Sequence, residues 1–173
     1  MCGNTLAGVI AFLVSQTGTA LAAAPFEFDS PLGIVTKLYH DYSYEVVFDQ
    51  NAPYSTVLDQ PQSVLGTYFT SSLTTLILQD RQSAEAHAWG YCHIDFVPMW
   101  AGKDATGFLV HLEQTAKPDE VLVTLTVPGV PPGTAEKVDL LYTVTKTPRG
   151  WHIADIKAKT WDLVSILSNK LGH

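Results

Sequence analysis

The spacing of apolar residues changes near residue 108, and this change constrains the fold more than any other feature. In residues 32–42, 64–69 and 73–77, apolar side chains recur every three or four positions, as they do on one face of a helix. From Phe108 onward they recur at every second position, as in Val121, Val123 and Leu125. Helices followed by strands with turn-length connections predict an α+β domain, with helices packed on one face of a curved antiparallel sheet.

Local signals set the expected boundaries of the helices. Ser30 is a hydroxyl N-cap followed by Pro31 at the first helical position, which predicts a helix that runs to about Val46. Pro61 opens a second, short helix. The hydroxyls at residues 70–72 cap a third helix, over about residues 71–88, and residues 48–60 are expected to form a loop.

Turn residues divide the second half into four expected strands. The strands cover residues 108–113, 121–127, 136–146 and 151–157, and a short terminal helix follows at about residues 161–167. Lys117, Pro118 and Asp119 form the first turn, and residues 147–150 form the last. Such short connections predict strands that pair in sequence order.

The N-terminal segment is typical of an export signal. Residues 6–24 carry no charged side chain and end in alanine-rich triplets that fit a small-x-small cleavage site. Its apolar run is short for a membrane span, although a retained anchor or a buried N-terminal helix is an alternative. We therefore expect a signal peptide at 1–24, a single domain at 25–173, and an exported protein of the periplasm or the medium. After cleavage no membrane span is expected, and Cys92 is the one remaining thiol.

Charge and motifs exclude several classes of function. The chain has 10 basic and 17 acidic side chains and a formal charge of −7, which argues against binding to nucleic acid. It contains no Gly-x-Ser-x-Gly segment for a serine nucleophile and no glycine-rich phosphate loop. His87, Cys92, His93 and Asp95 offer metal donors, but their spacing matches no known ligand pattern. No metal and no cofactor is therefore predicted.

Three segments resemble an exported bacterial family of unknown function. They are residues 149–156 before a short apolar helix, residues 94–104 between the helices and the sheet, and the helix of residues 69–80. The sequence departs from the family pattern at Ala154, often acidic there, and at Lys103, often glutamine there. The resemblance implies a nuclear-transport-factor-two-like fold, a cone of helices closed by a curved sheet. It implies no chemistry.

Five residues are candidates for a ligand-binding site in such a cone. They are Asp95, Trp100, Asp104, Trp151 and Asp155. A buried carboxylate can act as a general base, and tryptophans can line an apolar pocket. Strand alternation also places Asp155 on the same face as Trp151 and Ile153. Each residue has a structural alternative, as a turn cap or as part of the core.

These features favour a non-enzymatic exported domain that binds a partner protein or a small apolar ligand. One alternative is an isomerase or hydratase that uses a cavity aspartate as its base. The other is an immunity or inhibitor protein against a toxin, because an acidic surface suits a basic partner. An exposed outer sheet face would also permit a homodimer.

Overall fold

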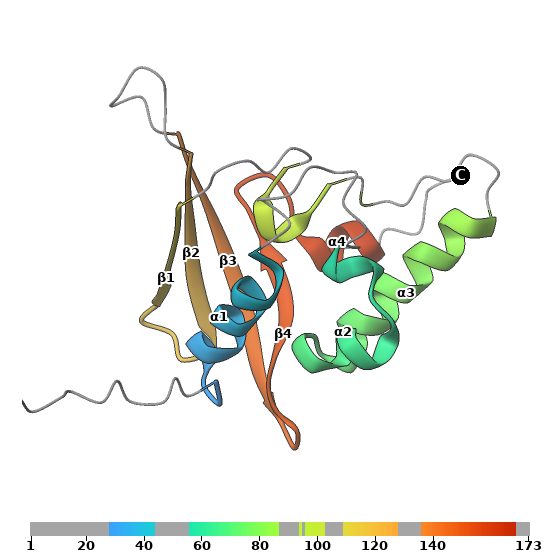
Figure 1. The fold of residues 1–173 in the computed structure, drawn as a ribbon, viewed down its shortest axis with the longest axis horizontal. Coiled ribbons are helices and arrows are strands. Elements are labelled where there is room, and N and C mark those ends of the chain that lie inside the picture. The colour runs from blue at the N-terminus through green and yellow to red at the C-terminus, as the bar shows by residue number, and fades with distance from the viewer. Residues whose placement is uncertain are drawn as a thin grey trace, which may run out of the picture.

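The computed structural model describes residues 28–43, 56–86, 94, 96–102, 109–127 and 136–168. Helices α1 (Pro31–Tyr42), α2 (Gln62–Tyr68) and α3 (Ser71–Ala86) precede strands β1 (Leu109–Gln114), β2 (Glu120–Val127), β3 (Glu136–Thr147) and β4 (Gly150–Lys157). Helix α4 (Leu163–Ser168) follows β4, and short 3-10 helices cover Val57–Asp59 and Pro98–Trp100. The prediction of an α+β fold with four antiparallel strands and a short C-terminal helix is confirmed (Figure 1).

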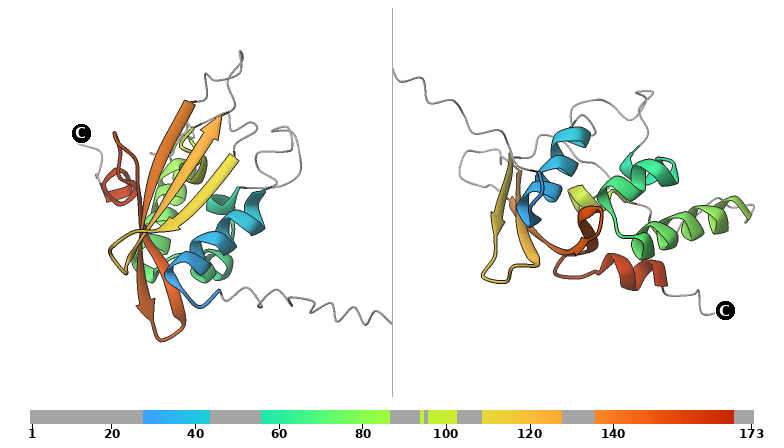
Figure 2. Two further views of the ribbon diagram at one scale, coloured as in Figure 1. Left: turned by 90° about the vertical axis from the view of Figure 1, so that its left-hand side faces the viewer. Right: turned by 90° about the horizontal axis from the view of Figure 1, so that it is seen from below.

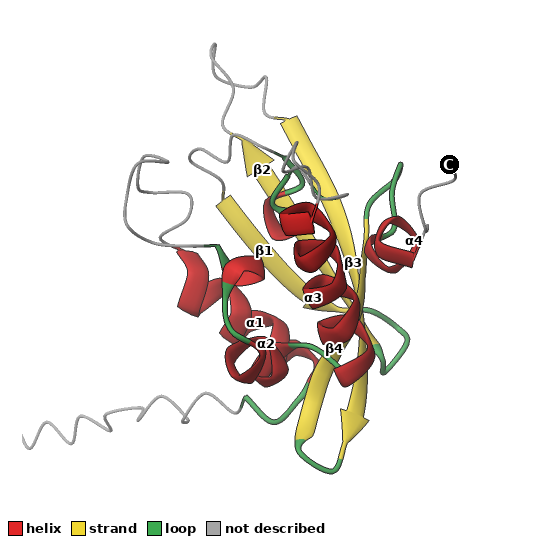
Figure 3. Ribbon diagram, turned by 90° about the vertical axis from the view of Figure 1, so that its right-hand side faces the viewer, coloured by secondary structure: helices red, strands yellow, loops and turns green. Residues whose placement is uncertain are grey.

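The four strands pair in sequence order, each antiparallel to its neighbour. One face of the sheet is apolar and buried, with Val123, Leu140 and Tyr142 at its centre. Helix α1 lies across this face, while α4 lies beyond the β4 edge of the sheet and packs against α3 (Figures 2 and 3). Helices α2 and α3 pack beside β4. Helices α1 and α3 therefore lie on the same side of the curved sheet, and α2 and α4 lie near its β4 edge (Figure 3).

Helix α1 begins where its cap signals predicted. The Ser30 hydroxyl accepts a hydrogen bond of 2.8 Å from the Gly33 amide, and Pro31 occupies the first turn. The buried face includes Val35, Leu38 and Tyr39, which follow the three- and four-residue spacing of the sequence. The expected end at Val46 lies outside the described residues.

The junction between α2 and α3 covers the edge of β4. The Thr70 amide donates a 2.9 Å hydrogen bond to the Ile153 carbonyl, and Phe69 forms an isolated parallel bridge with Ile153. The Thr70 hydroxyl accepts from the Leu73 amide at 3.3 Å and so caps α3. Pairing of this kind shields part of a strand edge that would otherwise present free backbone groups.

A β-bulge at Ala154 changes which side of the sheet Asp155 faces. Thr143 pairs with Asp155 and Val144 pairs with Ile153, so Ala154 is an extra residue on β4. Ile153 therefore lies on the apolar face, and Asp155 lies on the opposite face. The prediction that these two side chains share a face is wrong, because strict alternation does not count the bulged residue.

Candidate functional site

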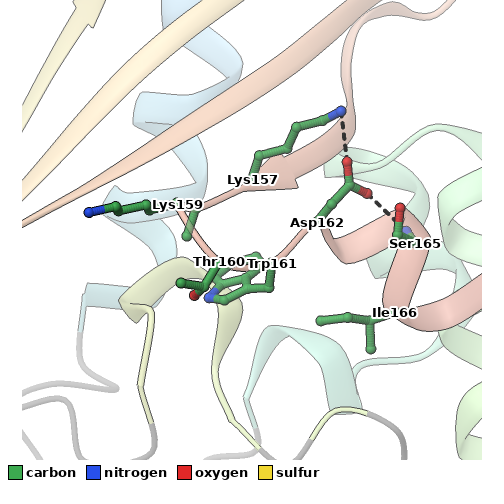
Figure 4. A pocket seen from close by; sticks show the side chains of 8 residues that line it. Lys157, Lys159, Thr160, Trp161, Asp162, Ser165 and Ile166 are labelled. Carbon is green, nitrogen blue, oxygen red and sulfur yellow. Dashed lines mark hydrogen bonds and ion pairs between the residues drawn. The ribbon is translucent and has the colours of Figure 1, made fainter.

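An open pocket of about 490 Å³ lies where β4 turns into α4. We call it the Trp161 pocket; it is lined by Lys157, Ala158, Lys159, Thr160, Trp161, Asp162, Ser165 and Ile166 (Figure 4). Its volume falls within the range of roughly 300–1,000 Å³ that is usual for small-molecule sites. Trp161 and Ile166 supply apolar surface, and the hydroxyls of Thr160 and Ser165 lie beside them. The lining is thus mixed, with apolar side chains next to hydrogen-bonding groups.

The local backbone fixes the shape of this turn. The Ala158 amide donates to the Trp161 carbonyl at 2.9 Å, and residues 157 and 162 form an antiparallel bridge. Asp162 then caps α4, because its carboxylate accepts from the Ser165 amide at 2.9 Å. The Trp161 ring packs against Phe96 with 5.0 Å between ring centroids and 59° between the ring planes. Trp161 is held from one side by this contact.

An ion-pair cluster borders the pocket. The Lys157 ammonium lies 2.7 Å from an Asp162 oxygen and 3.2 Å from an Asp155 oxygen. Both interactions raise the pKa of Lys157. Burial tends to raise the pKa of Asp162, but the hydrogen bonds from Lys157 and Ser165 outweigh it, so that pKa is lowered. Asp162 is therefore charged in the neutral range.

Asp155 ties the end of β4 to the start of α4. Its Oδ1 atom accepts hydrogen bonds from the Ile156 amide at 2.9 Å and the Val164 amide at 3.1 Å. Burial raises the pKa of Asp155, and the nearby charge of Asp162 adds to this effect. The opposing effects of the Val164 amide and the Lys157 ammonium are smaller in sum. The side chain therefore acts as a buried structural link.

Trp100 lies in the core beneath α1. Its side chain is 2% exposed, and its ring meets Tyr39 edge-on with 5.1 Å between centroids. The Tyr39 hydroxyl donates a 2.6 Å hydrogen bond to the Met99 carbonyl and lies 3.0 Å from the Tyr142 hydroxyl. These aromatic side chains fill the space between α1 and the sheet at this point.

Trp151 belongs neither to the ion-pair cluster around Asp155 nor to the aromatic residues around Trp100. It is half-buried, and the Lys146 ammonium lies 5.7 Å from its ring centroid. Asp95 and Asp104 lie outside the described residues. The three described candidates are therefore not brought together, and none lines the Trp161 pocket; a ligand-binding role for the five stays a prediction.

The Trp161 pocket was not predicted as a site. Its one sequence signal is an aromatic and a carboxylate, Trp161 and Asp162, in the loop between a strand and a helix, where binding residues often gather. The four possible metal donors, His87, Cys92, His93 and Asp95, lie outside the described residues. Within the described residues, no three His, Cys, Asp or Glu side chains lie close enough together to hold a metal ion.

A second polar cluster surrounds Asp41 at the end of α1. Its carboxylate accepts a 2.6 Å hydrogen bond from the Tyr68 hydroxyl, pairs with Lys37, and contacts a ring nitrogen of His40 at 2.9 Å. Burial acts in the opposite direction, but together these hydrogen bonds lower the pKa of Asp41 to about 2. The ionised carboxylate thus stabilises the fold by linking α1 to α2.

We expect Asp41→Asn to lower the free energy of unfolding by at most about 2 kcal/mol at pH 7. Because the pKa is lowered from 3.8 to about 2, this contribution is complete above pH 3.8 and is lost as the pH falls toward 2. Urea denaturation across this pH range measures it. The difference between the wild-type protein and the variant should shrink in acid, whereas the exposed turn variant Asp119→Asn should show little difference at any pH. A constant difference would contradict the assignment.

Comparisons with known proteins show no family for this chain. No protein-family model matches the sequence, and no curated protein matches it significantly. One similar solved structure is a protein of unknown function from Bacteroides thetaiotaomicron, at 15% identity, with a TM-score of 0.49, covering 73% of this chain and 88% of that one. Another is a phospholipid-binding protein from Ralstonia solanacearum, solved with a phospholipid, at 18% identity and a TM-score of 0.31, covering 77% and 68%.

Proposed function

We propose that the protein is an exported, non-enzymatic domain that binds a small apolar ligand in the Trp161 pocket. The observation that carries this proposal is the pocket itself. The Trp161 ring and the Ile166 side chain form its apolar part, and the hydroxyls of Thr160 and Ser165 lie within reach of a polar end of the ligand. Apolar surface with a few polar groups is the usual composition of small-molecule sites.

The hydrogen bonds and ion pairs of the two carboxylates near the pocket favour a binding function over a catalytic one. Asp155 is engaged by two backbone amides and by Lys157, and Asp162 is engaged by Lys157 and Ser165. A general base needs a free oxygen that can reach a substrate proton. Of the three aspartates named for an isomerase or hydratase, Asp95 and Asp104 lie outside the described residues.

The proposal includes export and a cone-type fold. Residues 1–24 would be removed as a signal peptide, and the domain of residues 25–173 would act in the periplasm or outside the cell. The position of α1 across a four-stranded antiparallel sheet supports the nuclear-transport-factor-two-like assignment. Among the described helices, none has both the length and the apolar character needed to cross a membrane.

A neutral apolar dye tests the binding site. We expect Nile red to bind saturably to the purified protein, and Trp161→Leu to weaken that binding by roughly tenfold, as removal of one central aromatic contact typically does. Ile166→Ala should weaken it less, because it removes a smaller surface. Fluorescence titration measures each dissociation constant.

Leu109→Ala is the matched control for Ile166→Ala. It also shortens an aliphatic side chain, but Leu109 lies on β1 and is 66% exposed, away from the pocket. Its dye affinity should equal that of the wild-type protein. Equal affinities for all four proteins would show that the dye does not use this pocket and would overturn the proposal.

A further inference from the structure

We propose that the ligand of the Trp161 pocket is an amphiphile with one anionic end, a carboxylate or a phosphate, which pairs with the Lys159 ammonium. This inference deepens the proposed function and rests on it, because it names the chemical class of the ligand that the pocket binds. The apolar part of the ligand lies along the Trp161 ring toward Ile166, and its charged end lies beside Lys159 and Thr160.

The two lysines that line the pocket differ in their contacts. The Lys157 ammonium lies 2.7 Å from an Asp162 oxygen and 3.2 Å from an Asp155 oxygen, so its charge is already paired. Lys159 is exposed, and within the part of the chain that the structure describes no carboxylate forms an ion pair with it. Lys159 therefore offers a positive charge that a ligand can neutralise.

The charges of the pocket favour one orientation of such a ligand. In Figure 4, Lys159 lies on one side of the Trp161 ring, whereas Asp162 and Ser165 lie on the other. An anionic group placed near Ser165 would be repelled by the Asp162 carboxylate. The same group placed near Lys159 would be attracted by its ammonium. The anionic end is therefore expected at Lys159, with the apolar part on the Trp161 side.

The hydrogen-bonding groups at this end of the pocket also suit an anion. The Lys159 ammonium is a donor only, and the Thr160 hydroxyl can donate as well. Both can donate to a carboxylate or phosphate oxygen, and a hydrogen bond between charged groups is roughly twice as strong as one between neutral groups. A cationic amphiphile would be repelled by Lys159. An uncharged amphiphile would gain the apolar contact but not the charged one.

Isothermal titration calorimetry with decanoate, decanol and inorganic phosphate tests the proposal, at about pH 7.5 and below the micelle concentration. Decanoate and decanol share one alkyl chain and differ in charge. We expect the wild-type protein to bind decanoate more tightly than decanol, and to bind inorganic phosphate at least about tenfold more weakly than decanoate, because phosphate buries no apolar surface. Lys159→Gln should weaken decanoate binding by roughly threefold to fivefold, the effect of one exposed ion pair, and leave decanol binding unchanged.

Lys146→Gln is the matched control. It removes the same charge from an exposed lysine on β3, outside the pocket, so its decanoate affinity should equal that of the wild-type protein. Lys159→Arg keeps a cation at the site and should retain decanoate binding. Because Lys159 is exposed, its replacement should not disturb folding, which circular dichroism checks.

Equal decanoate affinities of the wild-type protein and Lys159→Gln would overturn the anionic end, and so would equal wild-type affinities for decanoate and decanol. Phosphate binding as tight as decanoate binding would reveal a site for a free anion and would overturn the amphiphile. None of these results affects the proposed function while Nile red binding depends on Trp161. Decanoate binding that depends on Lys159 but is unchanged in Trp161→Leu would support the charged contact and overturn the proposed apolar site. No binding of Nile red, decanol or decanoate would overturn both proposals.

Discussion

Replacing Trp100 with alanine is expected to lower the free energy of unfolding by about 3–5 kcal/mol. The side chain is 2% exposed, and its ring packs edge-on against Tyr39 beneath α1. Its removal would leave a large cavity next to the hydrogen bonds that join Tyr39 to Met99 and Tyr142. Urea denaturation followed by far-ultraviolet circular dichroism measures the loss.

Trp151→Ala is the matched control for this change. Trp151 is half-buried and pairs with a surface lysine, so its loss should cost clearly less than the loss of Trp100. The opposite pattern would be informative. If Trp100→Ala keeps full stability but loses ligand affinity, Trp100 is a ligand-binding residue, as its sequence context predicts, and the core role assigned to it is wrong.

The second large effect is expected for Asp155→Ala, at about 3 kcal/mol of unfolding free energy. Alanine would leave the Ile156 and Val164 amides without their acceptor and would deprive Lys157 of one of its two carboxylates. The first amide lies near the end of β4, and the second lies in the first turn of α4. Denaturation by urea at pH 7 gives the difference from the wild-type protein.

Asp155→Asn separates the hydrogen bonds from the charge. Asparagine keeps an oxygen that can accept from both amides, and it removes a buried charge that is costly to desolvate. It should therefore cost much less than alanine at the same pH. Equal losses for the two variants would show that the carboxylate charge, and its pairing with Lys157, carries the stabilisation instead.

Local chemistry made most elements of this fold predictable. The start of α1 follows from Ser30 and Pro31, and the start of α3 from the hydroxyl of Thr70, because caps satisfy backbone groups within a few residues. The four strands lie within about two residues of their expected bounds, because alternation and turn residues are also local signals. Pairing in sequence order then follows from the short turns.

The site depends on long-range geometry and was less predictable. Trp100 and Trp151 were both candidates for a ligand site, yet the first is enclosed under α1 and the second lies half-exposed beside Lys146. This difference in burial comes from packing between segments that are distant in the sequence, and the spacing of apolar residues does not predict it. The Trp161 pocket likewise exists because a β-hairpin strand, a tight turn and a six-residue helix meet, with Phe96 from another segment behind the ring.

The bulge on β4 means that the face on which Asp155 lies depends on how β3 and β4 pair, and not on strict alternation along β4. Because the bulge leaves Ala154 out of the pairing with β3, Asp155 lies on the face opposite Ile153, which stays in the core. If β4 instead continued in regular register, Ala154 would pair with Thr143 and Asp155 would share the apolar face with Ile153, away from the Val164 amide. The face on which this carboxylate lies is thus set by the pairing of the backbone with β3 and not by the side chain at position 154.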